Sequence, residues 1–124
     1  MLFGELSRLA QVKKKIDKKQ PTLVYIGWRN CGPCAMATKI LEELQAAKRP
    51  LFKDEQLFIF EIDDTDVVDD QFLTTHKVAV IPNLLVFRKG KEIARVQGVE
   101  GNSELSLKEA YMSAINKAKR KKSA

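Results

Sequence analysis

The sequence has few residues of the kinds that build metal sites and disulfide-stabilised domains. It contains two cysteines and one histidine among 124 residues. A structural zinc site usually takes more Cys and His ligands than this chain offers, so we expect no metal. Long hydrophobic runs are also absent, since none approaches the roughly 18 to 20 residues of a membrane span. Residues 1–10 lack the basic, apolar and small-residue order of a signal peptide, and we therefore expect a cytoplasmic protein without a membrane segment.

Length and composition fit one globular domain over residues 1–124. Hydrophobic residues make up 44% of the chain. A chain of this size buries roughly two-thirds of the surface that its unfolded form exposes, which suffices for a core without a disulfide or a metal. No repeat or low-complexity linker divides the sequence. The two cysteines are therefore free to serve a chemical role.

The net charge of +6 is concentrated at the two ends of the chain. Residues 1–20 and 108–124 carry the excess of Lys and Arg, and residues 21–107 are slightly acidic. Such basic clusters could attract nucleic acid or an acidic partner. No aromatic side chains interleave with the lysines to stack on bases, however. The favoured interpretation is a solvated helix face near the start and a basic tail over residues 119–124.

Hydrophobic periodicity alternates between helical and extended patterns. The predicted helices cover residues 2–18 (within an N-terminal segment 1–20), 34–49, 63–75 and 106–118. The predicted strands cover residues 23–26, 57–62, 84–87 and 93–96. Ser106 and Glu109 match a capping box that would start the last helix. A helical crossover makes the first two strands parallel, and a short turn makes the last two an antiparallel hairpin. This order predicts an α/β fold, with a central mixed sheet and helices on both faces.

The sequence Cys31-Gly32-Pro33-Cys34 stands between the first strand and its helix. Two thiols three positions apart at a helix start can close a disulfide, because the first turn brings their side chains together. The free amides and positive end of the helix favour a thiolate, so we expect Cys31, the more N-terminal and exposed sulfur, to be the nucleophile. Cys34, one turn inside, is expected to be the resolving thiol that releases a partner bound to Cys31. Pro33 stiffens this turn without losing a helical hydrogen bond.

Other interpretations of the cysteine pair remain open. Cysteine is among the most buried residue types, so both residues could be inert. They could also bind a metal together with ligands from another subunit, or form a purely structural disulfide, which is rare in the cytosol. The Gly-Pro insert and the helix start favour a reactive pair over these alternatives. The only histidine, His76, is expected to be an ordinary residue at a helix end without a catalytic role.

Several residues together resemble the thioredoxin family. They are the stretch from Trp28 to Cys34 after a hydrophobic strand, Ile81-Pro82 ahead of the hairpin, and Gly90 and Gly98 around the last strand. The resemblance covers about residues 21–118. It implies a thioredoxin-like fold, with a central mixed sheet of about four to five strands and helices on both faces.

The resemblance also implies a role for each matching residue. Pro82 matches the family's cis-proline, which lets the backbone of Ile81 pair with an extended substrate segment. Gly98 matches the glycine that keeps the substrate groove open near the cysteines. The implied substrate-binding set is Trp28, Gly32, Pro33, Ile81, Pro82 and Gly98, beside the catalytic Cys31 and Cys34.

Three residues near the motif depart from the family's usual pattern. Asn30 stands where thioredoxins usually carry Trp before the first cysteine. Tyr25 occupies the position of a buried aspartate that relays a proton for the resolving cysteine, and Ile59 that of the accompanying lysine. A tyrosine whose pKa is near the ordinary ~10 is a poor base at neutral pH. We therefore expect slower resolution by Cys34, with the exchange itself retained.

Further departures concern shape. Asn83 replaces the usual threonine after the proline, and Val80 stands where a small residue is common, which predicts a narrower groove beside Ile81. Residues 2–18 read as a helix where the family begins with a strand, so the first strand is expected to be missing.

The motif and the resemblance together predict a thiol-disulfide oxidoreductase of thioredoxin type. It would reduce protein disulfides, with a reductase to recharge it and no cofactor beyond the redox-active Cys31–Cys34 disulfide. One alternative is a binding module, in which the fold holds a partner and the basic ends add affinity. Another is a redox sensor, whose disulfide state switches partner binding.

Overall fold

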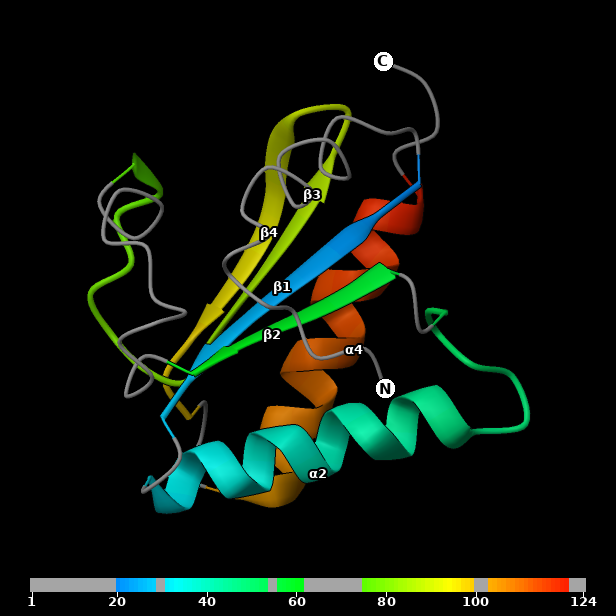
Figure 1. Cartoon of the computed structure of the whole chain (residues 1–124). Coiled ribbons are helices and arrows are strands. Elements are labelled where there is room, and N and C mark those ends of the chain that lie inside the picture. The colour runs from blue at the N-terminus through cyan, green and yellow to red at the C-terminus, as the bar shows by residue number, and fades with distance from the viewer. Residues whose placement is uncertain (1–19, 29–30, 54–55, 62–74, 100–102, 121–124) are drawn as a thin grey trace.

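A mixed four-stranded sheet forms the centre of the part of the chain described by the computed structural model, which covers residues 20–28, 31–53, 56–61, 75–99 and 103–120. The strand order is β2-β1-β3-β4. The expected helix over residues 2–18 and nearly all of the one over 63–75 lie outside the described residues, as do residues 121–124 of the expected tail. Figure 1 shows the sheet with helices α2 and α4 beside it. The prediction of an α/β fold with a central mixed sheet is thus confirmed, and the expectation of helices on both faces stays a prediction.

Strand β1 (Thr22–Gly27) lies inside the sheet and is buried at every position. It pairs in parallel with β2 (Leu57–Glu61) and antiparallel with β3 (Asn83–Arg88). The apolar run in its sequence is typical of a strand covered on both faces. The strands predicted over residues 23–26 and 57–62 are confirmed to within a residue of each end.

Strands β3 and β4 (Lys91–Gln97) form the predicted antiparallel hairpin. Lys89 and Gly90 make the turn, with φ angles of 52° and 78°. Positive φ at both central residues is the geometry of the two-residue turns whose twist matches the flanking strands. The positive φ angle at position 90 therefore favours glycine there.

Helix α2 (Gly32–Ala46) begins earlier and ends earlier than its predicted range of 34–49. It begins at Gly32 because Cys31 caps it, and it ends when Ala47 turns to an extended conformation, before Pro50. Among the described residues, no helix is long and apolar enough to cross a membrane.

Helix α4 (Glu104–Arg120) corrects the prediction that Ser106 and Glu109 start the last helix. Ser103 caps it instead: the Ser103 Oγ accepts from the Ser106 N–H at 3.1 Å, and the Ser103 carbonyl accepts from the Leu107 N–H at 3.0 Å. Ser103 and Ser106 are both plausible caps by residue type. With Ser103 as the cap, Glu104 lies in the first turn, where its charge suits the positive helix end.

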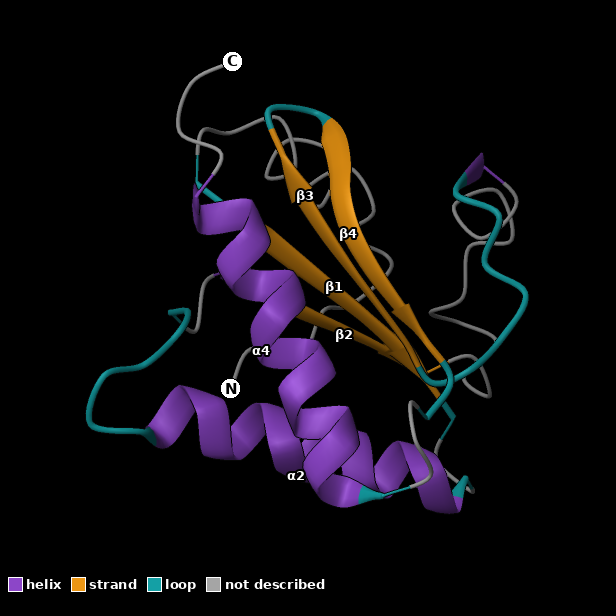
Figure 2. Ribbon diagram, turned by 180° about the vertical axis from the view of Figure 1, so that it is seen from behind, coloured by secondary structure: helices purple, strands orange, loops and turns teal. Residues whose placement is uncertain are grey.

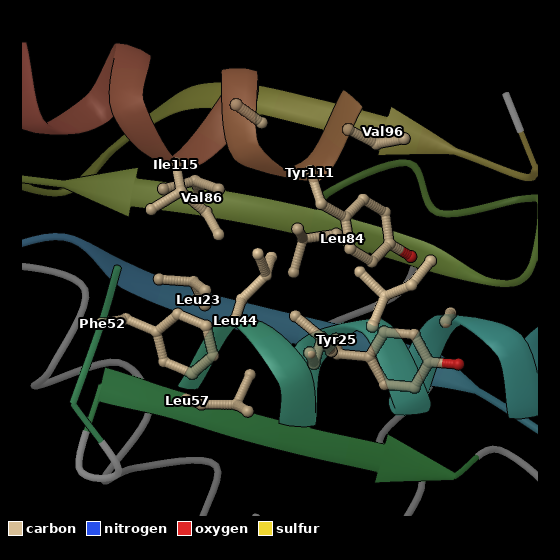
Figure 3. Packing of buried hydrophobic residues seen from close by; sticks show 14 of the residues in the cluster. Leu23, Tyr25, Leu44, Phe52, Leu57, Leu84, Val86, Val96, Tyr111 and Ile115 are labelled. Carbon is tan, nitrogen blue, oxygen red and sulfur yellow. The ribbon is translucent and has the colours of Figure 1, made fainter. Parts of the chain in front are cut away.

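The two described helices pack on the same face of the sheet and enclose one hydrophobic core. Its members include Leu23, Tyr25, Ala37, Ile40, Leu41, Leu44, Phe52, Leu57, Ile59, Leu84, Val86, Val96, Leu107, Tyr111, Ala114, Ile115 and Ala118. The α2 and α4 residues recur at three- and four-residue spacing, as amphipathic helices require. Figure 3 shows these side chains meeting between the sheet and the helices, with the Tyr25 and Tyr111 rings among them.

Tyr111 is fully buried, and its hydroxyl has no hydrogen-bond partner within the described part of the chain. Burial disfavours the phenolate and raises the pKa of Tyr111 far above its ordinary value of 10.0, and the nearby Tyr25 adds to the rise. The folded protein therefore holds this proton at a pH where the unfolded chain releases it.

The variant Tyr111→Phe tests this consequence by urea unfolding between about pH 7 and pH 11. Above pH 10.0 the unfolded chain binds fewer protons than the folded one, so rising pH destabilises the wild type. For Tyr111 alone this loss approaches about 1.4 kcal/mol per pH unit, and the variant lacks it. At pH 7 the variant should be as stable as the wild type or more so, because it no longer buries a hydroxyl to which the described residues offer no partner. Equal slopes above pH 10.0 in both proteins would contradict this account.

Candidate active site

Cys31 and Cys34 lie where β1 leads into α2, and they are joined by a disulfide with Cα atoms 5.1 Å apart. The sheet register places Ile26, near the end of β1, opposite Asn83 at the start of β3. The Ile81-Pro82 segment therefore arrives at the same edge of the sheet as the cysteine loop. The topology thus brings together two parts of the chain that the sequence had assigned to one site.

Cys31 is half-buried and caps helix α2. Its backbone is extended, with φ −113°, and its Sγ accepts from the Cys34 N–H at 3.2 Å. The Ala35 N–H donates to the Cys31 carbonyl at 3.2 Å and begins the helical ladder. Pro33 occupies the first turn, where its missing N–H has no partner to lose. A sulfur at this position faces the positive helix end and an amide donor, and both favour its thiolate form.

Cys34 is held more deeply, with 3% of its surface exposed. Its Sγ accepts from the Trp28 N–H at 3.4 Å. Its carbonyl accepts from two hydroxyls, Tyr25 Oη from β1 and Thr38 Oγ1 from the next turn of α2, each at 3.2 Å. The predicted order of exposure, with Cys31 outside and Cys34 inside, is confirmed.

Exposed apolar side chains accompany the disulfide at this edge of the sheet. Trp28 is 44% exposed and Val80 is 45% exposed. The Ile81–Pro82 peptide bond is cis, and the Pro82 carbonyl accepts from the Gly98 N–H at 2.7 Å. Gly98 has φ 69°, which favours glycine, and a Cβ there would lie 3.6 Å from Val80 Cγ1. The Gly98 hydrogen bond thus holds the backbone of the cis-proline close to the exposed Val80.

Comparison with known proteins decides the family. A family model described as Thioredoxin matches residues 7–113. The chain belongs to the thioredoxin family. With its Cys31–Cys34 disulfide, the protein is a thiol-disulfide oxidoreductase.

Among thioredoxin relatives, the thioredoxin of Mycolicibacterium smegmatis is 29% identical over 90 residues, which cover 73% of this chain and 76% of that protein. A bifunctional thioredoxin reductase/thioredoxin from Mycobacterium leprae is also 29% identical, over 73% of this chain and 18% of its own length. The solved structure of thioredoxin (Mala s 13) from Malassezia sympodialis has a TM-score of 0.65 at 15% identity, covering 88% of this chain and 84% of that one. The last likeness shows the thioredoxin fold.

The structure places most of the residues that sequence reasoning singled out for this thioredoxin site. The cis state implied for Pro82 is confirmed, and Gly32 and Pro33 lie exposed in the first turn of α2. Their roles in substrate binding stay predictions, as do those of Trp28, Ile81 and Gly98. Residues 29–30, and with them Asn30, lie outside the described residues.

The groove prediction needs one correction. Asn83 is fully buried, and its Nδ2 donates to the Val80 carbonyl at 3.3 Å, so its side chain cannot narrow a groove at the surface. Val80 is exposed, so of the two residues it is the one whose side chain could narrow the groove. The His76 ring lies edge-on to Phe87, with centroids 5.1 Å apart, and its carbonyl accepts from Arg95. Its expected lack of a catalytic role stays a prediction.

Sequence reasoning missed the part played by Gly27. A Cβ at this position would lie 2.5 Å from Tyr25 Oη and 2.9 Å from two ring carbons of Tyr25. The tyrosine therefore packs directly over the Gly27 backbone. A glycine that ends a strand is an ordinary sequence signal, and only the position of the tyrosine ring gives it this meaning.

Gly27→Ala should accordingly destabilise the protein by about 1 to 3 kcal/mol, because the new methyl group displaces a buried ring. The free energy of unfolding in urea measures this effect. Gly32→Ala is the matched control, since a Cβ there meets nothing within 4 Å and alanine favours the helix. Equal stabilities of the two variants would show that Tyr25 does not require a glycine at position 27.

Proposed function

We propose that this thioredoxin-family protein reduces disulfide bonds of other proteins, by attack of Cys31 and resolution by Cys34. The observation that carries the proposal is the asymmetry of the pair. Cys31 is the accessible sulfur at the helix start, and Cys34 lies 3% exposed behind it. An accessible nucleophile with a buried second thiol suits capture of a bulky substrate followed by its release.

In the first step the Cys31 thiolate attacks one sulfur of the substrate disulfide. A Cys31–substrate disulfide forms, the substrate S–S bond breaks, and the departing substrate sulfur leaves as a thiolate that takes a proton from solvent. The Cys34 N–H, which donates to Cys31 Sγ at 3.2 Å in the oxidised protein, supports the thiolate before attack.

In the second step Cys34 loses its proton to solvent and attacks Cys31 Sγ. The bond between Cys31 and the substrate breaks, the second substrate sulfur leaves, and the Cys31–Cys34 disulfide forms. Both electrons of the former dithiol have then passed to the substrate. Because the cysteines hold these electrons themselves, the reaction calls for no cofactor.

The exposed apolar residues beside the cysteines support a protein as the substrate. Trp28 and Val80 offer contact area, and the backbone of Ile81, before the cis-proline, is the proposed partner of an extended substrate segment. Gly32, Pro33 and Gly98 complete this proposed docking surface.

Turnover needs a donor that reduces the Cys31–Cys34 disulfide again. We propose a reductase that restores the dithiol as this donor, supported by the relative from Mycobacterium leprae that is named a bifunctional thioredoxin reductase/thioredoxin. A reducing compartment such as the cytoplasm is the proposed location, because there the pair can be kept in its dithiol form.

Trapping tests the order of the two steps. Reduced Cys34→Ser, mixed with insulin as a disulfide-bonded protein, should accumulate a covalent complex through Cys31, because the resolving thiol is gone. Cys31→Ser is the matched control and should form much less complex, since its remaining sulfur is buried. Non-reducing gels and mass spectrometry identify the complexes. Equal trapping by both variants, or no reduction of insulin by the wild type, would contradict the proposal.

A further inference from the structure

Tyr25 is a buried polar residue that the exchange steps above leave without a role. It is 1% exposed and lies in the central strand β1. Figure 3 shows its ring within the core, with the hydroxyl at the carboxyl end of β2. Since β1 and β2 are parallel, this is the end of the sheet at which β1 leads to the cysteines. The hydroxyl therefore lies beneath the redox site.

The Tyr25 hydroxyl contacts the backbone of Cys34 directly. It donates to the Cys34 carbonyl at 3.2 Å, and this hydrogen bond is buried. Thr38 Oγ1 also lies 3.2 Å from that carbonyl but is 3.0 Å from the Ala35 carbonyl as well, so its single proton is shared. Of these two hydroxyls, Tyr25 is the one that ties Cys34 to an element outside its own helix.

The same hydroxyl packs against the segment that holds the Cys34 sulfur. It sits over Gly27, where a Cβ would lie only 2.5 Å away. The next residue, Trp28, donates its N–H to Cys34 Sγ at 3.4 Å. Tyr25 thus fixes the carbonyl of Cys34. Through its contact with Gly27 it also restrains the backbone that leads to Trp28, whose N–H donates to Cys34 Sγ.

We propose that Tyr25 is a positioning residue for the resolving step, whose hydroxyl holds Cys34 in the orientation needed to attack Cys31. The hydroxyl acts as a hydrogen-bond donor to a carbonyl, so it takes no proton from Cys34. That proton passes to solvent, and the bonds made and broken are those of the second step above. The inference rests on the proposed function, because it concerns the second half of that reaction.

Tyr25→Phe tests the role, since it removes the hydroxyl and keeps the ring. Reduced protein is mixed with a fluorescent peptide disulfide, quenched with acid at intervals, and analysed for the mixed disulfide on Cys31. This separates the rate of its formation from the rate of its resolution. We expect resolution to slow by about 3- to 10-fold, the equivalent of one buried hydrogen bond, with formation unchanged within about twofold.

Tyr111→Phe is the matched control, because it removes the other buried tyrosine hydroxyl of this core, which has no partner in the described residues. It should resolve the mixed disulfide at the wild-type rate.

The outcomes separate this inference from the proposed function. Wild-type resolution in Tyr25→Phe, or equal slowing of both steps, would overturn the positioning role while leaving the oxidoreductase proposal intact. Slow resolution in Tyr111→Phe as well would also overturn it, since loss of any buried hydroxyl would then suffice. Failure of the wild type to form a mixed disulfide through Cys31 would overturn the proposed function, and this inference with it.

Discussion

The structure depends on the pairing of β1 with a neighbour on each side. Two partners and burial at every position leave this strand no freedom to slip or tilt, since a shift by one residue would turn its core side chains to the opposite face. Whatever follows its last residue is therefore placed reproducibly. In this chain that is the cysteine loop, and β3 places Ile81 and Pro82 at the same edge.

The start of helix α2 sets the electrostatic environment of the two cysteine sulfurs. Its first turn leaves backbone amides without helical partners, and the fold aims two N–H groups of this region at the two sulfurs, that of Cys34 at Cys31 and that of Trp28 at Cys34. Amide donors stabilise a thiolate without introducing a titrating side chain. These two contacts follow from where β1 ends and helix α2 begins.

The sequence allowed much of this to be predicted. The Cys31-Gly32-Pro33-Cys34 motif, the turn at Gly90 and the alternation of periods are local signals that each specify their own geometry. Contacts between residues far apart in the sequence could not be predicted from it. Nothing local distinguishes Ser103 from Ser106 as a cap, or shows that the Tyr25 hydroxyl reaches the Cys34 carbonyl. Such contacts depend on how the core packs and not on the pattern of any one segment.

The central claim is that Cys31 and Cys34 interconvert reversibly between dithiol and disulfide within one chain. An equilibrium titration in a series of thiol-disulfide buffers, read by alkylation and mass, tests it most directly, with a thioredoxin alongside as the standard. The account predicts that both thiols disappear together in a single two-electron transition, at a potential near that of the standard. Thiols that oxidise separately, or a pair that never forms a reversible intramolecular disulfide, would contradict it.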